Sequence, residues 1–535
     1  MTLFPTADQP RDLPKWPLPW HLDKSGWRRS PPAQPPAACC LPGWVLLAVP
    51  ALVELAIGGY RLGGPAIWRD EAYTIDASSR PVGQLFALLR HVDAVHGLYY
   101  LIMHFVMAAP GVSAQAIRLP SLAAAVAAAS LTAVLGRRLA RTAGLPAPSF
   151  TGMLAGVLLA ALPQTTYYAQ DARPYALVTL CAVAAAYLLV RAVAGNRPRW
   201  WAGYCAALAA AGAFNLFALL LVGAHGLTLL TVRGRVRLWR WLAAVAAAAL
   251  VLTPVIYYGY RQRGTVGWLT RPRVHAIVRL VAGFAGSQPL AWLVAAIALC
   301  GVIGGWPRRS GQELPPAAVA VPWLLLPAAV LLAVSQIHPV YDPRYVAFSL
   351  PALALLAAAG LSWLTRITAS LPLVHVGTRL AWVPAIVIVV LMGALLARPQ
   401  WAVRQPNSRP DNLGKLAAII AVNERPGDAV LFVPSKLRAT TYANPAVWTR
   451  LRDVALARPP ATSASLAGTQ ASPAVLVQRF SGVDRAWLVM SRKAVRGKML
   501  LSQMSQAVLR LTGTMHLIRQ WQVHSTVLRL YSRTA

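Results

Sequence analysis

Charged residues are scarce in this chain, and their scarcity excludes an ordinary soluble domain. Only 13% of the 535 residues are Asp, Glu, Lys or Arg, whereas 57% are hydrophobic. A soluble domain cannot bury that much apolar surface around one core. Apolar blocks of the length that crosses a bilayer, about 20 residues, recur from Leu41 to Ala397. We therefore expect an integral membrane protein with many helical spans.

Cysteine is also scarce, and a glycine-rich phosphate loop is missing. The 5 cysteines lie at or within apolar segments and none lies in 398–535, so no external disulfide framework is expected. Without a glycine-rich loop of the kind that holds nucleotide phosphates, a nucleotide-sugar or ATP-dependent enzyme is not expected. No cleavable signal peptide is expected before the first span.

Acidic residues are the rarer charge, since 16 Asp and Glu face 51 Lys and Arg, for a net charge of +35. A basic face on a soluble domain would suggest nucleic acid as a partner. The basic residues of this chain, nearly all Arg, instead lie mostly in short loops between apolar blocks, where positive charge sets membrane orientation. We therefore expect a lipid bilayer as the partner, and no nucleic acid.

The apolar blocks predict a topology. They lie at about 42–60, 95–109, 118–136, 150–165, 174–194, 199–213, 214–232, 237–258, 289–306, 318–336, 345–364 and 380–397. The block 95–109 is short and contains His96 and His104. If it does not cross, the arginine-rich loops all fall on the side of the N-terminal tail, as the positive-inside rule requires. These loops contain Arg137, Arg138, Arg141, Arg197, Arg199, Arg233, Arg235, Arg237, Arg240, Arg308 and Arg309.

We therefore expect about 11 spans in the cell membrane, with a cytoplasmic N-terminus and an extracytoplasmic C-terminus. The segment 81–110 would lie along or dip into the outer membrane surface. One alternative stays open, because 199–232 forms either two short spans or one broken helix, and the second case reverses the sides of everything that follows.

The sequence predicts that the chain has three parts. Residues 1–40 are Pro-rich and polar and predict a disordered cytoplasmic tail, 41–397 form the transmembrane part, and 398–535 have ordinary globular composition. In the last part, we predict a helix at 412–424, strands at 428–433 and 486–491, and a hairpin at 516–532. The fold class is thus a polytopic α-helical membrane protein with a small extracytoplasmic α/β domain.

An acidic pair, Asp70 and Glu71, follows the first apolar block. Adjacent carboxylates beside a span are costly unless they are solvated, paired or functional. One interpretation is a solvated loop. The other makes Asp70 a general base that deprotonates an acceptor hydroxyl, with Glu71 in support.

The same outer loop continues with His91, Asp93, His96, Tyr99 and Tyr100. Three interpretations stay open. The first three residues suit a divalent cation, for which Mg or Mn is considered. The set also suits contacts to a sugar or an acceptor, or plain packing at the interface with the tyrosines as anchors.

The second outer loop contains Asp171, Arg173 and Tyr175. Asp171 either pairs locally with Arg173 or faces Asp70 across the site, where it would position the acceptor or a metal ion. Arg173 and Tyr175 join the candidate contacts to the sugar or acceptor.

The third outer loop, 259–288, carries arginines but no acidic residue. They include Arg261, Arg263, Arg271 and Arg273. An excess of Arg on the outer side is the opposite of what the positive-inside rule predicts, so these arginines need another explanation. They bind either a phosphate, whose oxygens match guanidinium groups, or anionic lipid headgroups. Arg344, in the fourth outer loop, either binds phosphate or extends towards the interface.

Three segments together resemble the GT-C superfamily of membrane glycosyltransferases. They are the acidic pair after the first span, Ala-Gln-Asp-Ala-Arg-Pro-Tyr at 169–175, and Asp-Pro-Arg-Tyr at 342–345. The likeness covers roughly residues 42–400. It is nearest to the protein O-mannosyltransferase and aminoarabinose transferase branch, particularly actinobacterial mannosyltransferase-like members.

The resemblance implies transfer of a sugar, with mannose expected, from a polyprenyl-phosphate carrier to an acceptor hydroxyl at the outer membrane face, with inversion. The acceptor would be a cell-wall glycan, a lipoglycan or a protein. By position, Asp70 matches the catalytic carboxylate, Glu71 its neighbour and Asp171 the second acidic residue. Arg344 and some arginines of the third loop would hold the donor phosphate.

The residues alone also allow this chemistry, because a lipid-phosphate leaving group needs stabilising cations but no protonating acid. The main rival is a transporter or flippase of a lipid-linked or anionic substrate. Such a protein would place ionisable residues within its spans, whereas the polar residues of this chain gather at one face. A structural or assembly protein is the second rival, and it leaves the paired acids unexplained.

Overall fold

The computed structural model describes residues 42–109, 111–232, 238–306, 314–370, 383–495 and 513–533. The predicted tail 1–40 lies outside the described residues, as do Arg233, Arg235, Arg237, Arg308 and Arg309. Within the described ranges, helices occupy every apolar block that the sequence predicted, so the helical character of the membrane part is confirmed.

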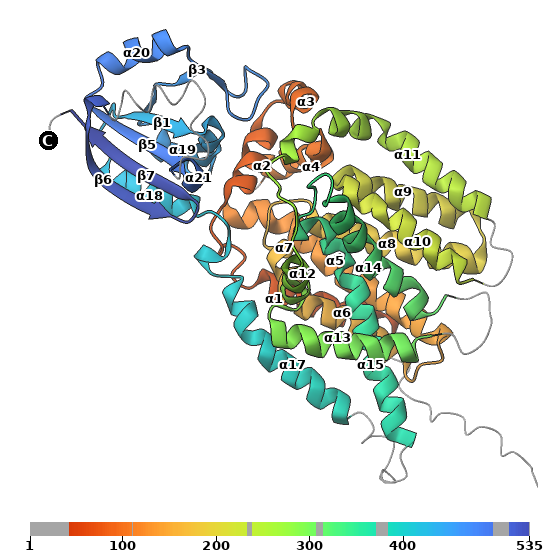
Figure 1. The fold of residues 1–535 in the computed structure, drawn as a ribbon. Helices are drawn as coiled ribbons and strands as arrows, with labels where there is room; N and C mark the ends of the chain where they lie inside the picture. Colours follow the sequence, from red (N-terminus) through yellow and green to blue (C-terminus); the bar gives the residue numbers. More distant parts are fainter. Residues whose placement is uncertain are drawn as a thin grey trace, which may run out of the picture. The chain divides into compact units, whose positions relative to one another are not determined.

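The membrane part consists of helices joined by short loops (Figure 1). Its α-helices are α1 (Gly43–Gly59), α2 (Arg69–Ser79), α3 (Val82–His91), α4 (Gly97–Ala108), α5 (Ala114–Thr142), α6 (Pro148–Ala161), α7 (Pro163–Ala169), α8 (Tyr175–Gly195), α9 (Pro198–Phe214), α10 (Leu220–Leu230), α11 (Leu238–Arg261), α12 (His275–Ala285), α13 (Gln288–Gly304), α14 (Pro316–Val334), α15 (Leu350–Ser370) and α17 (Val383–Ala402). Short 3-10 segments are η1 (Ala94–His96), η2 (Leu216–Leu219), η3 (Arg263–Val266) and η4 (Pro343–Ser349).

Several of these helices are long and apolar enough to cross a membrane. Among the described residues, 5 segments pass that test, namely α5, α8, α11, α14 and the η4–α15 run Pro343–Thr368. The pair α12 and α13, bent by 83°, makes a sixth if it is one broken span. The chain is thus a multi-pass membrane protein, and the count of about 11 spans is not confirmed.

Two breaks explain why predicted blocks became shorter helices. The block 150–165 divides at Leu162, which is extended because Pro163 follows it and disfavours a helical conformation. The segment 199–232 divides at Asn215, whose side chain accepts a hydrogen bond of 3.0 Å from the Phe217 amide. This segment therefore consists of α9 and α10 with the short η2 between them, an arrangement that agrees with both alternatives, two short spans and one broken helix.

Close helix contacts in the membrane part depend on glycine. A Cβ added to Gly301 of α13 would lie 1.9 Å from the Leu356 carbonyl oxygen, and one added to Gly360 of α15 would lie 2.0 Å from that of Ile297. Only the absence of a side chain lets these two backbones approach so closely. In the same way α6 packs on α5 through Gly152. Helix α5 contacts α1, α6 and α8, and so lies at the centre of the bundle.

The C-terminal part is an α/β domain. It contains η5 (Pro406–Ser408), α18 (Leu413–Asn423), β1 (Ala429–Val433), η6 (Ser435–Ala443), α19 (Pro445–Trp448), β2 (Arg452–Asp453), β3 (Leu456–Arg458), β4 (Thr469–Gln470), α20 (Pro473–Ser481), β5 (Arg485–Ser491), α21 (Arg492–Val495), β6 (His516–Val523) and β7 (Thr526–Ser532). The main sheet has the order β2-β1-β5-β7-β6, with β1 parallel to β2 and β5, and β7 antiparallel to β5 and β6 (Figure 1). The predicted helix, two strands and hairpin are confirmed.

The sheet is covered on both faces, as the unbroken apolar runs of β1 and β5 require. Leu431 and Leu488 face a cluster with Leu476 of α20, whereas Val430 and Val489 face the other cluster, with Leu416 of α18. This second cluster also includes Ala72 of α2. The helix that carries the acidic pair is therefore packed against the C-terminal domain.

Candidate active site

Asp70 and Glu71 occupy the first turn of α2, where carboxylates are favoured by the helix dipole. Consecutive helical side chains point about 100° apart, and the two acids accordingly have different surroundings. Asp70 keeps 24% of its side chain exposed, and its Oδ2 accepts a hydrogen bond of 2.8 Å from Arg344 Nη1. Arg344 is 17% exposed, so this ion pair is open to solvent.

Glu71 is fully buried, and its carboxylate is used for structure. Arg118 of α5 donates to both carboxylate oxygens, through Nε at 2.8 Å and Nη2 at 2.7 Å. The amide of Ala172 donates to Oε1 at 2.9 Å. Arg118 also donates to the carbonyls of Leu62 and Pro65. Glu71 thus joins α2, α5 and the Asp171 loop, and it does not reach a position where it could touch a substrate.

Asp171 is buried beside this ion pair. Trp68 Nε1 donates to its Oδ1 at 2.9 Å, and its Oδ2 has no hydrogen-bond partner among the described residues. Burial raises the pKa of Asp171 to about 6, the charge of Glu71 adds to the rise, and the positive charge of Arg409 opposes it. The Asp171 carboxyl therefore takes up a proton at a higher pH than an ordinary aspartate does.

Arg173 does not pair with the Asp171 carboxylate, so the local ion pair considered from sequence is wrong. Its guanidinium instead lies 2.7 Å from His96 Nε2 and 3.5 Å from the backbone oxygen of Asp70. Burial, together with the charges of Arg173 and Arg344, lowers the pKa of His96. The neutral ring accepts from Arg173, which brings a second cation next to Asp70.

The residues His91, Asp93 and His96 do not converge as metal ligands. His91 is exposed at the end of α3, while Asp93 accepts a hydrogen bond of 2.9 Å from the Tyr100 hydroxyl. Burial raises the pKa of Asp93. Over the residues that the structure describes, no group of three or more His, Cys, Asp or Glu is placed to hold a metal ion. This cluster therefore does not fit a metal.

The tyrosines predicted at the interface lie inside the protein. Tyr99 and Tyr100 on α4 are both fully buried, so the interpretation as interfacial anchors is wrong. The apolar residues around them on α4 predict this burial better than their position beside a predicted span does. Tyr175, the first residue of α8, is also buried, and its ring centroid lies 5.1 Å from that of Tyr168 in α7.

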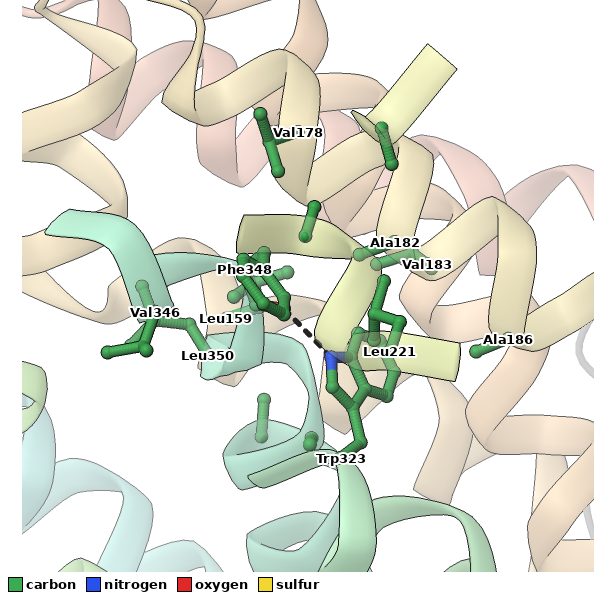
Figure 2. Close-up of a cluster of buried hydrophobic side chains, with 14 of the residues drawn as sticks. Leu159, Val178, Ala182, Val183, Ala186, Leu221, Trp323, Val346, Phe348 and Leu350 are labelled. Atoms are coloured by element: carbon green, nitrogen blue, oxygen red, sulfur yellow. Dashed lines mark hydrogen bonds between the residues drawn. The ribbon is translucent and has the colours of Figure 1, made fainter. Parts of the chain in front are cut away.

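Arg344 is held by a well-packed segment. Asp342 caps the N-terminus of η4, because its side chain accepts a hydrogen bond of 3.1 Å from the Arg344 amide. Figure 2 shows Phe348 packed beside Trp323 of α14, whose indole Nε1 donates to the Phe348 carbonyl at 3.0 Å. Val178 and Ala182 of α8 complete the cluster. This packing fixes the backbone from which Arg344 reaches Asp70.

The arginines of the third outer loop do not contact Asp70. Arg261, Arg263, Arg271 and Arg273 are all exposed. Arg261 donates to the Tyr257 hydroxyl at 3.0 Å, and Arg263 to the Tyr260 carbonyl at 3.2 Å. The loop reaches the site through Trp268, which lies under the Arg344 guanidinium at 5.5 Å. A cation–π contact of this kind holds a guanidinium while leaving its donors free.

Three residues at the site were missed from sequence, namely Arg118, Trp268 and Arg409. Arg118 had a signal, because it is a lone charge at the start of an apolar block. Arg409 donates to the carbonyls of Tyr167 and Gln170 at 2.9 and 2.7 Å, and stacks on the Tyr167 ring at 3.6 Å. No pattern marked Arg409 or Trp268.

Comparison with known proteins gives likenesses of structure. No family model matches the chain, and no curated protein sequence matches it. The crystal structure of ArnT from Cupriavidus metallidurans in the apo state has a TM-score of 0.56 at 16% identity, over 91% of this chain and 98% of that chain. ArnT bound to undecaprenyl phosphate has a TM-score of 0.52 at 16% identity over the same shares.

The arabinofuranosyltransferase AftD from Mycobacteria is less similar, with a TM-score of 0.45 at 17% identity over 91% of this chain and 41% of that chain. The two ArnT structures cover almost the full length of both chains. At this identity such a likeness shows the fold. The chain therefore shares its fold with the two ArnT structures.

Proposed function

We propose that the protein transfers a sugar from a polyprenyl-phosphate donor to an acceptor hydroxyl at the outer membrane face, with Asp70 as general base. The observation that carries the proposal is the partly exposed ion pair of 2.8 Å between Asp70 and Arg344. A base and a phosphate-binding cation are the two groups that this reaction requires. ArnT has been solved with undecaprenyl phosphate bound, which supports a carrier of this class.

The proposed reaction is a single displacement. Asp70 takes the proton of the acceptor hydroxyl, whose oxygen forms a bond to the anomeric carbon of the sugar. The bond from that carbon to the phosphate oxygen breaks, and its electron pair stays on the polyprenyl phosphate. Arg344 stabilises this leaving group by charge-assisted hydrogen bonds. Attack from the face opposite the phosphate inverts the configuration at the anomeric carbon.

The ion pair also explains how the empty and loaded states differ. Without substrate, Asp70 and Arg344 neutralise each other. When the donor phosphate takes over Arg344, the Asp70 carboxylate is released for the acceptor hydroxyl. Arg173, which lies beside the Asp70 backbone, is a second cation for the phosphate. The exposed arginines Arg261, Arg263, Arg271 and Arg273 would act earlier, by attracting the anionic donor.

The buried acids have positioning parts in this proposal. Glu71 orients the first turn of α2 through Arg118, and Asp171 sets the loop that carries Arg173. Mannose is the expected sugar, and a pentose is the alternative. The acceptor would be a cell-wall glycan, a lipoglycan or a protein. A divalent cation stays a separate proposal, for which the partly exposed carboxylates of Asp70 and Asp342, both paired with Arg344, are the candidates.

The test is a transfer assay in membranes with radiolabelled polyprenyl-phosphate mannose and polyprenyl-phosphate arabinose. Wild type is compared with Asp70→Asn and with Asp484→Asn, an exposed carboxylate in the C-terminal domain. We expect transfer by wild type and Asp484→Asn, and a loss of about 10²-fold or more for Asp70→Asn. Wild-type rates from a folded Asp70→Asn protein would rule out Asp70 as the base.

A transporter or flippase is the alternative if no polyprenyl-phosphate sugar is used by either protein. One observation favours it, namely that Glu54 in α1 is fully buried and its carboxylate has no hydrogen-bond partner among the described residues. Ionisable groups within spans often mark a transport path. Transport of the labelled lipid into vesicles, lost in Glu54→Gln, would then identify that function.

A further inference from the structure

A pocket of about 220 Å³ lies between the C-terminal ends of α5 and α8. Its polar lining comes from Arg137, Arg138, Arg141 and Thr142 on α5, and from Tyr187 and Arg191 on α8. Four guanidinium groups from two helices thus converge on one cavity. We call this set of six side chains the arginine pocket. Its volume is far above the roughly 10–15 Å³ that holds a single water molecule.

The arginine pocket is remote from Asp70. Arg118, which binds Glu71 beside the candidate active site, and Arg138 both lie on α5, 20 residues apart along the helix. At 1.5 Å per residue this separation is about 30 Å, the hydrophobic thickness of a bilayer. The pocket therefore lies at the opposite end of the bundle, and its role is independent of the transfer proposed above.

The positive charges of the arginine pocket are not neutralised by the described residues. None of its four arginines takes part in a salt bridge there. Among the described residues, Arg138 Nε is buried without a hydrogen-bond partner, and Arg191 donates a hydrogen bond of 3.3 Å to the Tyr187 hydroxyl. Glu313, next to Leu314 in the sequence, lies outside the described residues, and a single carboxylate would leave three charges over.

Such an arrangement is unfavourable without an anion. Like charges at positions i and i+4 of a helix, as for Arg137 and Arg141, destabilise it. The repulsion increases where protein and lipid lower the effective dielectric constant. The positive-inside rule accounts for arginines in a loop, but these four lie within α5 and α8 and point into a shared cavity.

We propose that the arginine pocket binds the phosphate headgroup of an anionic lipid in the leaflet at this end of the bundle. Guanidinium groups match phosphate oxygens in charge and geometry. Basic pockets between membrane helices are typical headgroup sites. Aromatic groups that suit the lipid interface border the pocket, because the Arg191 guanidinium stacks on Trp200 at 4.3 Å. Arg141 is exposed, which leaves the pocket open to the headgroup.

The test measures lipid bound to the purified full-length protein by native mass spectrometry. The protein is placed in nanodiscs of phosphatidylcholine containing either cardiolipin or phosphatidylglycerol. Wild type is compared with Arg138→Gln/Arg191→Gln. The matched control, Arg197→Gln/Arg366→Gln, removes two exposed arginines that do not line the arginine pocket.

We expect wild type and the control to retain anionic lipid when they are released from the nanodiscs in the spectrometer, and the pocket variant to bind it at least about tenfold more weakly. A third protein, Arg138→Lys/Arg191→Lys, keeps the charge and packing but loses the guanidinium geometry, and should bind with intermediate affinity. It replaces the glutamine variant if that one does not fold. Equal lipid binding by wild type and both pocket variants would overturn the proposal.

Free phosphate is distinguished in a second arm. Inorganic phosphate at millimolar concentration is added to wild-type protein in phosphatidylcholine nanodiscs, and thermal unfolding is recorded. We expect cardiolipin to raise the melting temperature and inorganic phosphate to leave it unchanged. Stabilisation by inorganic phosphate together with no retained lipid would show that the ligand is a soluble anion, and would contradict the lipid proposal.

Discussion

Helix α5 has arginines at both ends, and the two ends differ in whether the charges of these arginines are paired within the protein. At the N-terminal end, Arg118 is fully buried, and its charge is matched by Glu71 at 2.7 Å. Three further hydrogen bonds to carbonyls use its remaining donors. At the C-terminal end, Arg137, Arg138 and Arg141 take part in no salt bridge among the described residues. The arginine at the first end has all its partners within the protein, whereas the arginines at the second end are available to a ligand.

The same difference separates the two neighbours in the acidic pair. Both carboxylate oxygens of Glu71 accept hydrogen bonds from the protein, whereas Asp70 takes part in a partly exposed ion pair. A fully paired buried charge fixes backbone geometry, because moving either partner leaves the other uncompensated. A partly exposed charge can exchange its partner for a substrate at little cost. Pairing and exposure together, rather than charge alone, separate structural from chemical residues in this protein.

The largest effect expected from this comparison is on stability. Glu71→Gln leaves Arg118 buried without its counter-charge, and should lower the free energy of unfolding by about 3–5 kcal/mol. Arg137→Gln at the other end of α5 should change it by less than about 0.5 kcal/mol. Thermal unfolding in detergent and the yield of folded protein measure both. Similar losses for the two variants would remove the distinction between the ends.

The next effect is on turnover. Arg344→Gln removes the cation that we assign to the leaving phosphate, and should lower kcat about 10²-fold. Its melting temperature should stay near that of wild type, because Trp323 and Phe348 hold η4 without Arg344. Arg271→Gln and Arg273→Gln, in the exposed third loop, should lower turnover less than about fivefold. A larger loss of turnover from either loop variant would instead assign phosphate binding to the third loop.

Part of this site was predictable from the sequence. Apolar blocks gave the helices because backbone groups in a bilayer must pair within a segment, which leaves few alternatives. Placing Asp70 and Arg344 on one side of the membrane required only the order of spans and loops, and the structure brings these two residues, 274 positions apart, to 2.8 Å.

The partners of the buried charges were not predictable in the same way. The sequence predicts Arg118 only as the first residue of a span, because a linear pattern does not indicate whether its side chain turns towards Glu71 or towards water. The sequence predicts that the third loop contributes arginines to the site, yet Trp268 is the residue of this loop that contacts Arg344. Irregular loops have no periodicity, so the side chain that reaches a site depends on tertiary packing.

A smaller effect should follow from the contacts that hold α2 against the C-terminal domain. Arg69 of α2 donates to Asp411 at 3.1 Å and to Ser525 at 3.3 Å. Asp411→Asn weakens these contacts, and should lower kcat about tenfold with little change in KM, because Asp70 loses its orientation while the donor contacts persist. Arg452→Gln, which removes an exposed arginine side chain from the same domain, is the control and should stay within about twofold of wild type. An equal loss in both variants would point to the stability of the domain instead.

The smallest expected effect is a change of stability with pH that separates Asp171 from its paired neighbour Glu71. Burial raises the pKa of Asp171 to about 6 in the folded protein, above its ordinary value of 3.8. The folded state therefore binds the proton more tightly than the unfolded state, and this contribution to stability is full below pH 3.8 and is lost as pH rises through 6. Asp171→Asn carries no titrating group and still accepts from Trp68. Between pH 5 and 7.5, the melting temperature of wild type should fall relative to that of Asp171→Asn by a few degrees at most. Because His96, Asp93 and all other titrating groups are common to both proteins, the difference isolates Asp171, and a constant difference across this range would mean that its carboxylate stays ionised.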